Sequence, residues 1–591
     1  MGAAFSQPTT LSNPSAVANK SYDYIIVGGG TAGCVLANRL SEDAGVSVLL
    51  VEAGGSNEGE LFSKIPVGYA QLLKSSRDWC YKTTPQAALN NRVLDYARGK
   101  IMGGSASINA LVYQHCSPSD FDEWETKGAT GWNYNALAPY LRKSEKFTPH
   151  PAHPDVRPED RGDNGVWQTS YGYAHTICDR WMDAAVAVGV PRNPDLNTVR
   201  GSIGVSKFVT FVDQKGQRSS TATAFLSKDV LRRKNLTVIT NTLTTRILFS
   251  PDARLRATGI EVAQDESSPR FEITARKEVI LAAGAVNSPQ LLMLSGVGEK
   301  SELDKLGIPV VKNLFHVGKN LLDHPLVPIL FRAKGGHTLD YMQDPFKALP
   351  VMLRWFLTGR GPCTSNGGEA ALFVRSDDES LPFTSPVSES QASELVDNTS
   401  GPDSPDIEIG VVPASYRPLP KGKSGLTIVP ILVRPLSVGR LWLSSSSPFE
   451  KPNINPAFLA DPADMKLMLR GIRLALRIGR GAALQPMLDL KENSEDVQDV
   501  YWPGDADPDK VLDKDLEVWV RNNIETVNHC AGTARIGNSE EDGVVDAQLR
   551  VFGIDGLRVI DASIFPTMVS GHPTAPVVAI AEKASDMILK G

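Results

Sequence analysis

Long apolar runs are missing from this sequence. A helix that spans a bilayer needs about 20 consecutive apolar residues, and no segment of the chain is apolar over that length. Residues 1–20 also lack the uninterrupted apolar core of a secretory signal. We therefore expect no transmembrane segment and an intracellular, cytoplasmic protein, with secretion left open for a chain whose leader has been removed.

Clustered cysteines and blocks of like charge are missing too. The six cysteines are scattered and include no Cys-x-x-Cys pair, which argues against a zinc site and against a disulfide framework. The net charge of −6, without any Lys/Arg block, lacks the electrostatic footprint of a nucleic-acid-binding protein. We expect a small-molecule partner, no metal and no nucleic acid.

The chain has the composition of an ordinary globular enzyme. Hydrophobic residues make up 41% and charged residues 22% of it, as in typical soluble domains. Its 591 residues exceed what one core usually supports, and we find no internal repeat. These features predict two domains, intertwined or discontinuous along the chain.

A glycine-rich turn near the N-terminus predicts a dinucleotide site. The pattern is strand, Gly-x-Gly-x-x-Gly, helix and strand, over residues 22–27, 28–33, 34–40 and 46–51. Gly28, Gly30 and Gly33 let the backbone approach a pyrophosphate at the helix N-terminus. Glu52, 19 residues after Gly33, can accept hydrogen bonds from a ribose hydroxyl. The same fingerprint serves NAD and FAD, so it leaves the dinucleotide open.

Two further stretches point to a family. Residues 98–109 contain a Gly-Gly-Ser turn suited to packing on a flat ring or a diphosphate. With residues 284–298, the chain resembles the glucose-methanol-choline (GMC) oxidoreductases, because this stretch fits the family's internal signature at every defined position. Residues 98–109 are similar to the family's other signature, with departures at Ala106 and, just beyond it, at Cys116.

The resemblance spans residues 22–588 and includes members that oxidise aryl alcohols, choline and hydroxymethylfurfural. Further similar stretches are residues 235–238, 317–324 and 558–566.

The resemblance implies an α/β fold. It has a discontinuous Rossmann-type FAD-binding domain and a substrate domain built around an antiparallel sheet. We expect a flexible tail at residues 1–20, the FAD domain at 21–165, 230–330 and 520–591, and the substrate domain at 166–229 and 331–519. Alternation of apolar and polar residues over 439–444 predicts a strand, and an Ala-rich segment over 576–584 predicts a helix.

FAD is the cofactor that the resemblance implies. Together with the glycine motif it predicts these FAD-binding residues: Gly28, Gly30, Thr31, Ala32, Gly33, Glu52, Ala53, Arg98, Met102, Gly103, Gly104, Ser105, Asn109, Ala110, Val238, Ala283, Asp561, Ala562, His572 and Thr574. Some relatives attach FAD covalently through a histidine just before the position of Asn109. Ile108 stands there in this chain, so we expect non-covalent FAD.

Two histidines near the C-terminus lie in loops bounded by Gly or Pro, at residues 528–533 and 571–576. In the family these loops meet over the flavin, and the resemblance gives catalytic roles to His529 and His572. Histidine titrates near neutrality and can take the hydroxyl proton while hydride leaves the alcohol carbon. We expect His529 to be the general base and His572 to hold the alcohol oxygen.

Two further residues are candidates for the substrate side. Cys530 abuts the base and either lines the pocket, reacts if its pKa is lowered, or simply packs. Glu369 lies in a stretch similar to one in choline-oxidising and furfural-oxidising relatives, where it would orient a polar group or bind a cation. A buried structural carboxylate is an equal alternative.

Two segments raise further questions. Residues 377–405 are rich in Ser, Asp, Glu and Pro and predict a mobile loop, either an active-site lid or a surface insertion. Gly2 and Ser6 fit a myristoylation pattern, and a single acyl chain would give only weak, reversible membrane association.

The function that we expect is FAD-dependent oxidation of a primary alcohol, aromatic or furanic, to the aldehyde. Hydride passes to flavin N5, and the electrons pass to O2 or another acceptor. The alternatives are a non-redox FAD-containing lyase or cyclase and, against the presence of His529, a flavin photoenzyme. The sequence leaves the alcohol, the oligomeric state and the choice between oxidase and dehydrogenase open.

Overall fold

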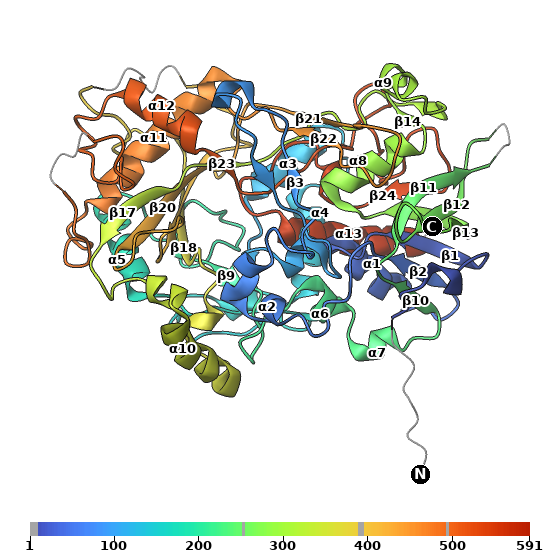
Figure 1. The fold of residues 1–591 in the computed structure, drawn as a ribbon, viewed down its shortest axis with the longest axis horizontal. Helices are drawn as coiled ribbons and strands as arrows, with labels where there is room; N and C mark the ends of the chain where they lie inside the picture. Colours follow the sequence, from blue (N-terminus) through green and yellow to red (C-terminus); the bar gives the residue numbers. More distant parts are fainter. Residues whose placement is uncertain (1–9, 251–253, 388–394, 492–495, 591) are drawn as a thin grey trace, which may run out of the picture.

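The computed structural model describes residues 10–250, 254–387, 395–491 and 496–590. Two seven-stranded sheets form its two halves, and helices cover both (Figure 1). None of the described helices combines the length and the apolar character needed to cross a bilayer. Gly2 and Ser6 lie outside the described residues, as do residues 388–394 of the predicted loop.

The first sheet is built from segments far apart in the sequence. Its order is β10-β2-β1-β13-β12-β11, with β24 also on β13. The strands are β1 (Ser21–Val27), β2 (Val48–Val51), β10 (Leu236–Ile239), β11 (Leu243–Phe249), β12 (Ala257–Ala263), β13 (Phe271–Leu281) and β24 (Leu557–Val559). β1, β2, β10, β13 and β24 run parallel, while β11 and β12 extend the sheet antiparallel.

Apolar runs explain the centre of this sheet. Ile25, Ile26, Leu49 and Leu50 are fully buried, as expected for parallel strands covered on both faces. The helices that pack in this half include α1 (Thr31–Leu40), α4 (Tyr134–Ser144), α8 (Gly284–Leu294) and α13 (Thr574–Lys590). The predicted C-terminal helix, residues 576–584, lies within α13, which crosses the middle of the molecule (Figure 1).

The second sheet is antiparallel, as expected. Its order is β23-β16-β20-β19-β18-β8, with β17 also on β20. The strands are β8 (Gly204–Lys207), β16 (Pro325–Leu326), β17 (Ile329–Ala333), β18 (Ala370–Val374), β19 (Ile407–Val412), β20 (Ser424–Leu432) and β23 (Glu525–Thr526). Two helices, α5 (Thr176–Ala187) and α11 (Pro462–Gly479), pack against it.

Strand β19 shows how this sheet serves two environments. Successive side chains of a strand point to opposite faces. Ile407 and Ile409 belong to the core formed with α11, whereas Glu408 and Gly410, which alternate with them, line a cavity. The opposite face of the sheet is therefore free to form the wall of a site.

Three sequence-based boundaries need correction. β16 and β23 lie in the ranges expected for the FAD domain but belong to the second sheet. A strand forms within residues 439–444 as predicted, but this strand, β21 (Arg440–Trp442), pairs with β22 (Asn453–Asn455) in a separate small sheet and not in the second sheet. The tail expected at residues 1–20 is partly bound, because the Leu11 N–H donates to the Val238 carbonyl of β10 at 2.9 Å.

Candidate active site

A cavity of about 970 Å³ is lined by residues of both sheets. Ligand pockets usually measure about 300–1,000 Å³, so this one has room for a large ligand. The glycine-rich turn of β1 and α1 lies on its wall, and so do His529 and His572. The two motifs, which are some 500 positions apart in the sequence, therefore share one site.

The turn between β1 and α1 is shaped for close approach of a ligand to the backbone. Gly28 has a φ of 103°, and a Cβ there would lie 2.6 Å from the Ala282 carbonyl oxygen. A Cβ on Gly33 would lie 1.8 Å from the Gly28 oxygen, so Gly33 lets α1 pack on the turn. A Cβ on Gly30, the N-cap of α1, would meet no atom closer than 3.8 Å. The absent side chain at Gly30 leaves the helix N-terminus open to the cavity.

Two hydrogen bonds hold the Glu52 carboxylate at the end of β2, and each of its oxygens keeps a free lone pair. Its Oε2 accepts from the Gly29 N–H at 2.8 Å and its Oε1 from the Gly54 N–H at 2.7 Å. Burial raises the pKa of Glu52 to about 7, against these two backbone hydrogen bonds, which lower it. Each carboxylate oxygen can accept a second hydrogen bond, as a pair of ribose hydroxyls would require.

A second glycine loop and three helix ends complete the nucleotide half. A Cβ on Gly104 would lie 2.8 Å from Gly30 Cα, so the two glycine loops stack closely. Thr31, Gly284 and Thr574 are the first residues of α1, α8 and α13, and all three line the cavity. Helix N-termini carry partial positive charge and free N–H groups, which favour a diphosphate. This half therefore fits a dinucleotide.

Most of the predicted residues line the cavity. They are Gly28, Gly30, Thr31, Ala32, Glu52, Ala53, Arg98, Gly104, Ser105, Asn109, Ala110, Ala283, Asp561, Ala562, His572 and Thr574, with His529 and Cys530. The lining residues do not include Gly33, Met102, Gly103 or Val238. Met102 and Gly103 lie behind the wall, since the Gly103 N–H donates to the Gly29 carbonyl at 2.7 Å. Thr242 and Leu243, a few positions after Val238, line the cavity in its place.

The loop that carries His529 is fixed by a buried carboxylate, Asp323. Its Oδ1 accepts from the backbone N–H of His529 at 2.7 Å and from that of His324 at 2.8 Å. Its Oδ2 accepts from the Thr526 hydroxyl at 2.6 Å. Asp323 thus fixes two histidine-bearing segments relative to each other.

The rings of these two histidines are in contact through their Nδ1 atoms. His529 Nδ1 lies 3.0 Å from His324 Nδ1, so only one of the two nitrogens carries a proton. His324 Nε2 is buried and has no hydrogen-bond partner among the described residues. In the tautomer that carries its proton on His529 Nδ1, His529 donates in this contact, and its Nε2 is the nitrogen free to accept a proton.

The environment keeps His529 uncharged. Burial, followed by the repulsion that His572, His324 when protonated, and Arg98 exert on a second positive charge, holds the pKa of His529 well below its usual 6.5. Burial, with the His572 charge, also lowers the pKa of His324 to about 3. A neutral imidazole at neutral pH is a competent proton acceptor.

His572 lies beside His529, with ring centroids 4.8 Å apart. His572 Nε2 lies 3.1 Å from Glu408 Oε1, and the Phe208 ring packs edge-on to the imidazole at 5.2 Å. The backbone N–H of His572 donates to Gln114 Oε1 at 3.0 Å. Glu408, missing from the sequence-based predictions, lines the cavity and is the carboxylate in contact with His572. Its only signal is a single acidic residue within the apolar strand β19.

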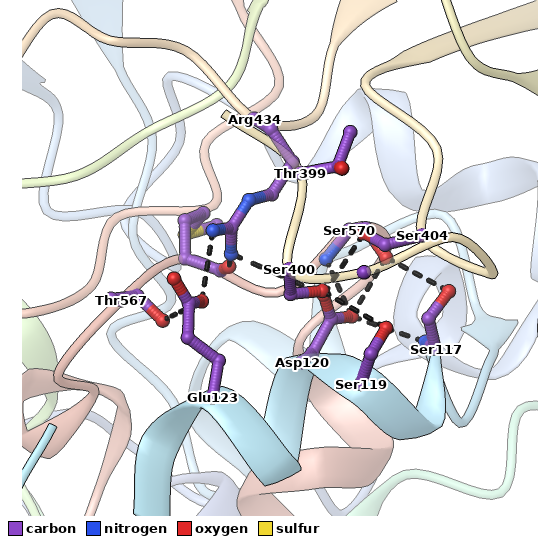
Figure 2. A network of polar contacts seen from close by, with 12 residues as sticks. Ser117, Ser119, Asp120, Glu123, Thr399, Ser400, Ser404, Arg434, Thr567 and Ser570 are labelled. Carbon is purple, nitrogen blue, oxygen red and sulfur yellow. Dashed lines mark hydrogen bonds and ion pairs between the residues drawn. The ribbon is translucent and has the colours of Figure 1, made fainter. Parts of the chain in front are cut away.

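The loop before His572 is tied down by a polar network that Figure 2 shows. The Ser570 N–H and hydroxyl donate to Asp120 Oδ2 at 2.9 and 2.7 Å, and the Ser400 hydroxyl donates to Asp120 Oδ1 at 2.7 Å. Glu123 Oε2 accepts from Thr567 and forms an ion pair of 2.8 Å with Arg434. Both acids come from helix α3 (Pro118–Thr126), which therefore positions the loop.

Of the two substrate-side candidates, Cys530 lines the cavity and Glu369 does not. Glu369 is absent from the cavity lining; it is buried and accepts from the Ser365 hydroxyl at 2.6 Å, as a structural carboxylate would. Burial raises the pKa of the Cys530 thiol, which argues against a reactive thiolate. Cys116, where relatives usually have glycine, has a φ of 67°. The described residues contain no cluster of three or more potential metal ligands.

Comparisons of family models, sequences and solved structures all match this chain to GMC oxidoreductases or to named dehydrogenases and oxidases. Models of the GMC oxidoreductase N- and C-terminal parts match residues 22–326 and 435–581. Dehydrogenase str4 of Strobilurus tenacellus is 43% identical over 96% of this chain and 94% of its own length. Human mitochondrial choline dehydrogenase is 34% identical over 98% and 91%. A solved structure of formate oxidase from Aspergillus oryzae superposes with a TM-score of 0.86 at 30% identity, covering 97% of this chain and 99% of that one.

Proposed function

The chain belongs to the GMC oxidoreductase family, and on that basis we propose that it oxidises a primary alcohol to the aldehyde with His529 as general base. FAD is its cofactor, and its activity is that of a flavin-dependent oxidoreductase acting on alcohols. Bound FAD supplies the hydride acceptor. The observation that carries the proposal is the pair of contacting histidines on the wall of the nucleotide cavity.

Proton removal falls to His529. Its Nε2 takes the hydroxyl proton, and Nδ1–H donates to His324, which shares the positive charge that forms. His572 Nε2 is held by Glu408, so the donor to the alcohol oxygen is the His572 Nδ1–H of the doubly protonated ring, which stabilises developing negative charge. Proton removal by a placed base typically contributes about 100- to 10,000-fold to the rate.

The wall of the cavity supports an aromatic or furanic alcohol over a cationic one. Val112, Phe208, Val429 and Ile431 line it near the catalytic end. The carboxylate there, Glu408, is already engaged by His572. An uncharged, flat substrate fits these surroundings because apolar walls reward burial of apolar area. Electrons then pass to O2 or to another acceptor.

The test is a single-turnover measurement on His529→Ala. Stopped-flow mixing of the holoenzyme with an aromatic primary alcohol without oxygen should bleach the oxidised flavin band. The variant should keep its FAD and reduce it about 100- to 10,000-fold more slowly. His337→Ala, at a histidine outside the cavity lining, is the matched control and should behave as the parent enzyme. Bleaching at the parent rate in His529→Ala would contradict the assignment.

The same measurement separates the alternative, a non-redox lyase or cyclase. Such an enzyme would leave the flavin oxidised with every alcohol of a panel. Hydrogen peroxide formation compared with dye reduction then identifies the acceptor.

A further inference from the structure

Helix α10 (Pro345–Thr358) is attached to the molecule by one face only. Trp355 is buried on that face and its Nε1–H donates to the Gly216 carbonyl at 2.7 Å. Trp355 also packs in a small apolar cluster with Ile65. The helix ends at Gly359, which has a φ of 65°. The attachment is therefore well defined, and α10 stands at the margin of the molecule (Figure 1).

The opposite face of α10 is apolar and open. Its large side chains are among the most exposed apolar residues of the protein: Phe346 88%, Leu349 65%, Leu353 55%, Phe356 77% and Leu357 72%. At 3.6 residues per turn they fall within an arc of about 100° on the helix. Scattered surface apolar residues are normal, whereas a continuous exposed patch marks an interaction site.

Cationic side chains lie next to this arc. Lys347 and Arg354 follow it on the helix surface, and Arg360 and Lys215 lie at the C-terminal end, where the Lys215 backbone approaches Gly359. The acidic residue of the helix is Asp344 at the N-cap. None of these four cations forms an ion pair with a residue in the described part of the chain. Their charge is available to a partner.

We propose that α10 docks this protein onto an anionic phospholipid surface. An apolar arc bordered by Lys and Arg is the pattern of a helix that lies in the headgroup region with its apolar side chains among the acyl chains. The 14 residues of α10 measure about 21 Å, short of the roughly 30 Å of a bilayer core. The helix therefore lies along the surface and does not cross it.

The size and charge of the patch favour lipid over a second copy of the chain. One face of a helix about 21 Å long and about 10 Å wide is far smaller than the roughly 800 Å² per partner of a stable interface. A symmetric contact would also bring the four cations of one copy toward the same four of the other. Anionic headgroups instead neutralise them, at about fivefold in affinity for each cation near the surface.

Docking would bring one wall of the cavity close to the bilayer. Ile65, which packs against Trp355, leads directly into the short helix η2 (Pro66–Gln71). Tyr69 of η2 and the following Leu73 line the cavity, and Leu73 is exposed. A ligand dissolved in the membrane would have a short path to the site. The docking proposal does not depend on which alcohol is oxidised.

Vesicle flotation of the FAD-loaded full chain tests the docking. The vesicles are phosphatidylcholine alone and phosphatidylcholine with phosphatidylserine. Every protein carries Gly2→Ala, so that no acyl chain contributes. We expect binding to the mixed vesicles, and the double variant Phe346→Ser/Phe356→Ser should lower the partition coefficient on the order of tenfold for each phenylalanine. Phe315→Ser, at an exposed phenylalanine elsewhere, is the matched control and should bind unchanged.

Two further measurements complete the test: one removes positive charge from α10, and the other checks that the variants remain folded. Lys347→Gln/Arg354→Gln should remove most of the preference for phosphatidylserine. Flavin absorbance and turnover of a soluble alcohol should stay at the parent level in all variants, since these residues lie outside the cavity lining. Failure of the parent to float, or flotation indifferent to the α10 substitutions, would overturn the proposal. So would a dimer in ultracentrifugation that dissociates in Phe346→Ser/Phe356→Ser.

Discussion

The chemistry at the residue scale depends on three imidazoles in a row. His324 contacts His529 through their Nδ1 atoms, and His529 contacts His572 face to edge. Burial and two neighbouring rings disfavour charge on the middle one, whose pKa lies well below 6.5. A pKa lowered in this way keeps the middle imidazole neutral near neutral pH, as the general-base role that we propose for His529 requires.

This arrangement predicts a pH effect of His572→Asn. The charge on His572 lowers the pKa of His529, so its removal raises that pKa. The base works only when unprotonated, and activity is lost as pH falls through its pKa. The acidic limb of kcat/KM should therefore move to higher pH, while kcat/KM itself falls. His337→Asn is the control, and a limb that stays in place in His572→Asn would contradict the electrostatic account.

Single residues were predictable where a local motif contained them. Gly28, Gly30 and His529 stand in short stretches with a fixed pattern, and the structure places all three at the cavity. Glu408 and His324 were not predicted as site residues, because each belongs to the site through a contact with a histidine 164 or 205 positions away in the sequence. For Glu369 the sequence left a substrate role and a buried structural role as equal alternatives, and the fold buries its carboxylate against the Ser365 hydroxyl.

At the scale of elements, the site is made of loops held by helices. The segment that presents His572 has no regular structure of its own, and α3 supplies the two acids that hold it (Figure 2). Such a loop holds its catalytic side chain in a fixed position only as long as its hydrogen-bond partners stay in place. The precision of the catalytic end thus comes from a helix that does not line the cavity.

Asp120→Asn tests this support. One amide NH2 would replace an oxygen that now accepts hydrogen bonds, leaving buried donors unpaired at about 1–3 kcal/mol. We expect a lower melting temperature and a kcat reduced roughly tenfold, with FAD retained. Asp122→Asn, on the exposed side of the same helix, should change neither. Equal loss of FAD and of kcat would instead indicate a general folding defect.

Helices and strands with a clear hydrophobic period could be predicted from the sequence, whereas the pairing of strands that are far apart in the sequence could not. The strand over 22–27 and the helix over 34–40 lie within the observed β1 and α1. The strand expected over 439–444 forms, but its partner is the local β22 and not the large sheet. Alternation along a strand reports its faces and carries no information about which strand lies beside it.

At the scale of the whole molecule, the cavity lies between two sheets and includes residues from both. Residues of β1, β2 and their turns form one wall, and residues of β19 and β20 form another. The family resemblance predicted two sheets and their types. The limits between the halves were inexact at β16 and β23, because a two-residue strand has too little pattern to show where it pairs.

Removal of FAD should lower the stability of the whole molecule. A ligand that binds only the folded chain stabilises it by about 2.7 kcal/mol at 100 times its Kd. Ile108 lines the cavity where some relatives carry the linking histidine, so acid precipitation should release the flavin into the supernatant. Calorimetry of the apoprotein should show a lower melting temperature that added FAD restores. Flavin retained in the pellet would contradict non-covalent binding.

The order of strands in the first sheet also has a consequence for biosynthesis. β1 and β2 leave the ribosome early, yet their neighbours β10 and β13 follow some 200 residues later, and β24 closes the sheet only at residues 557–559. Domains generally fold as their residues emerge, but this nucleotide site has no contiguous precursor. The complete cofactor site therefore forms only when almost the entire chain has been made, and until then the outer edges of the early strands have no partner in the sheet.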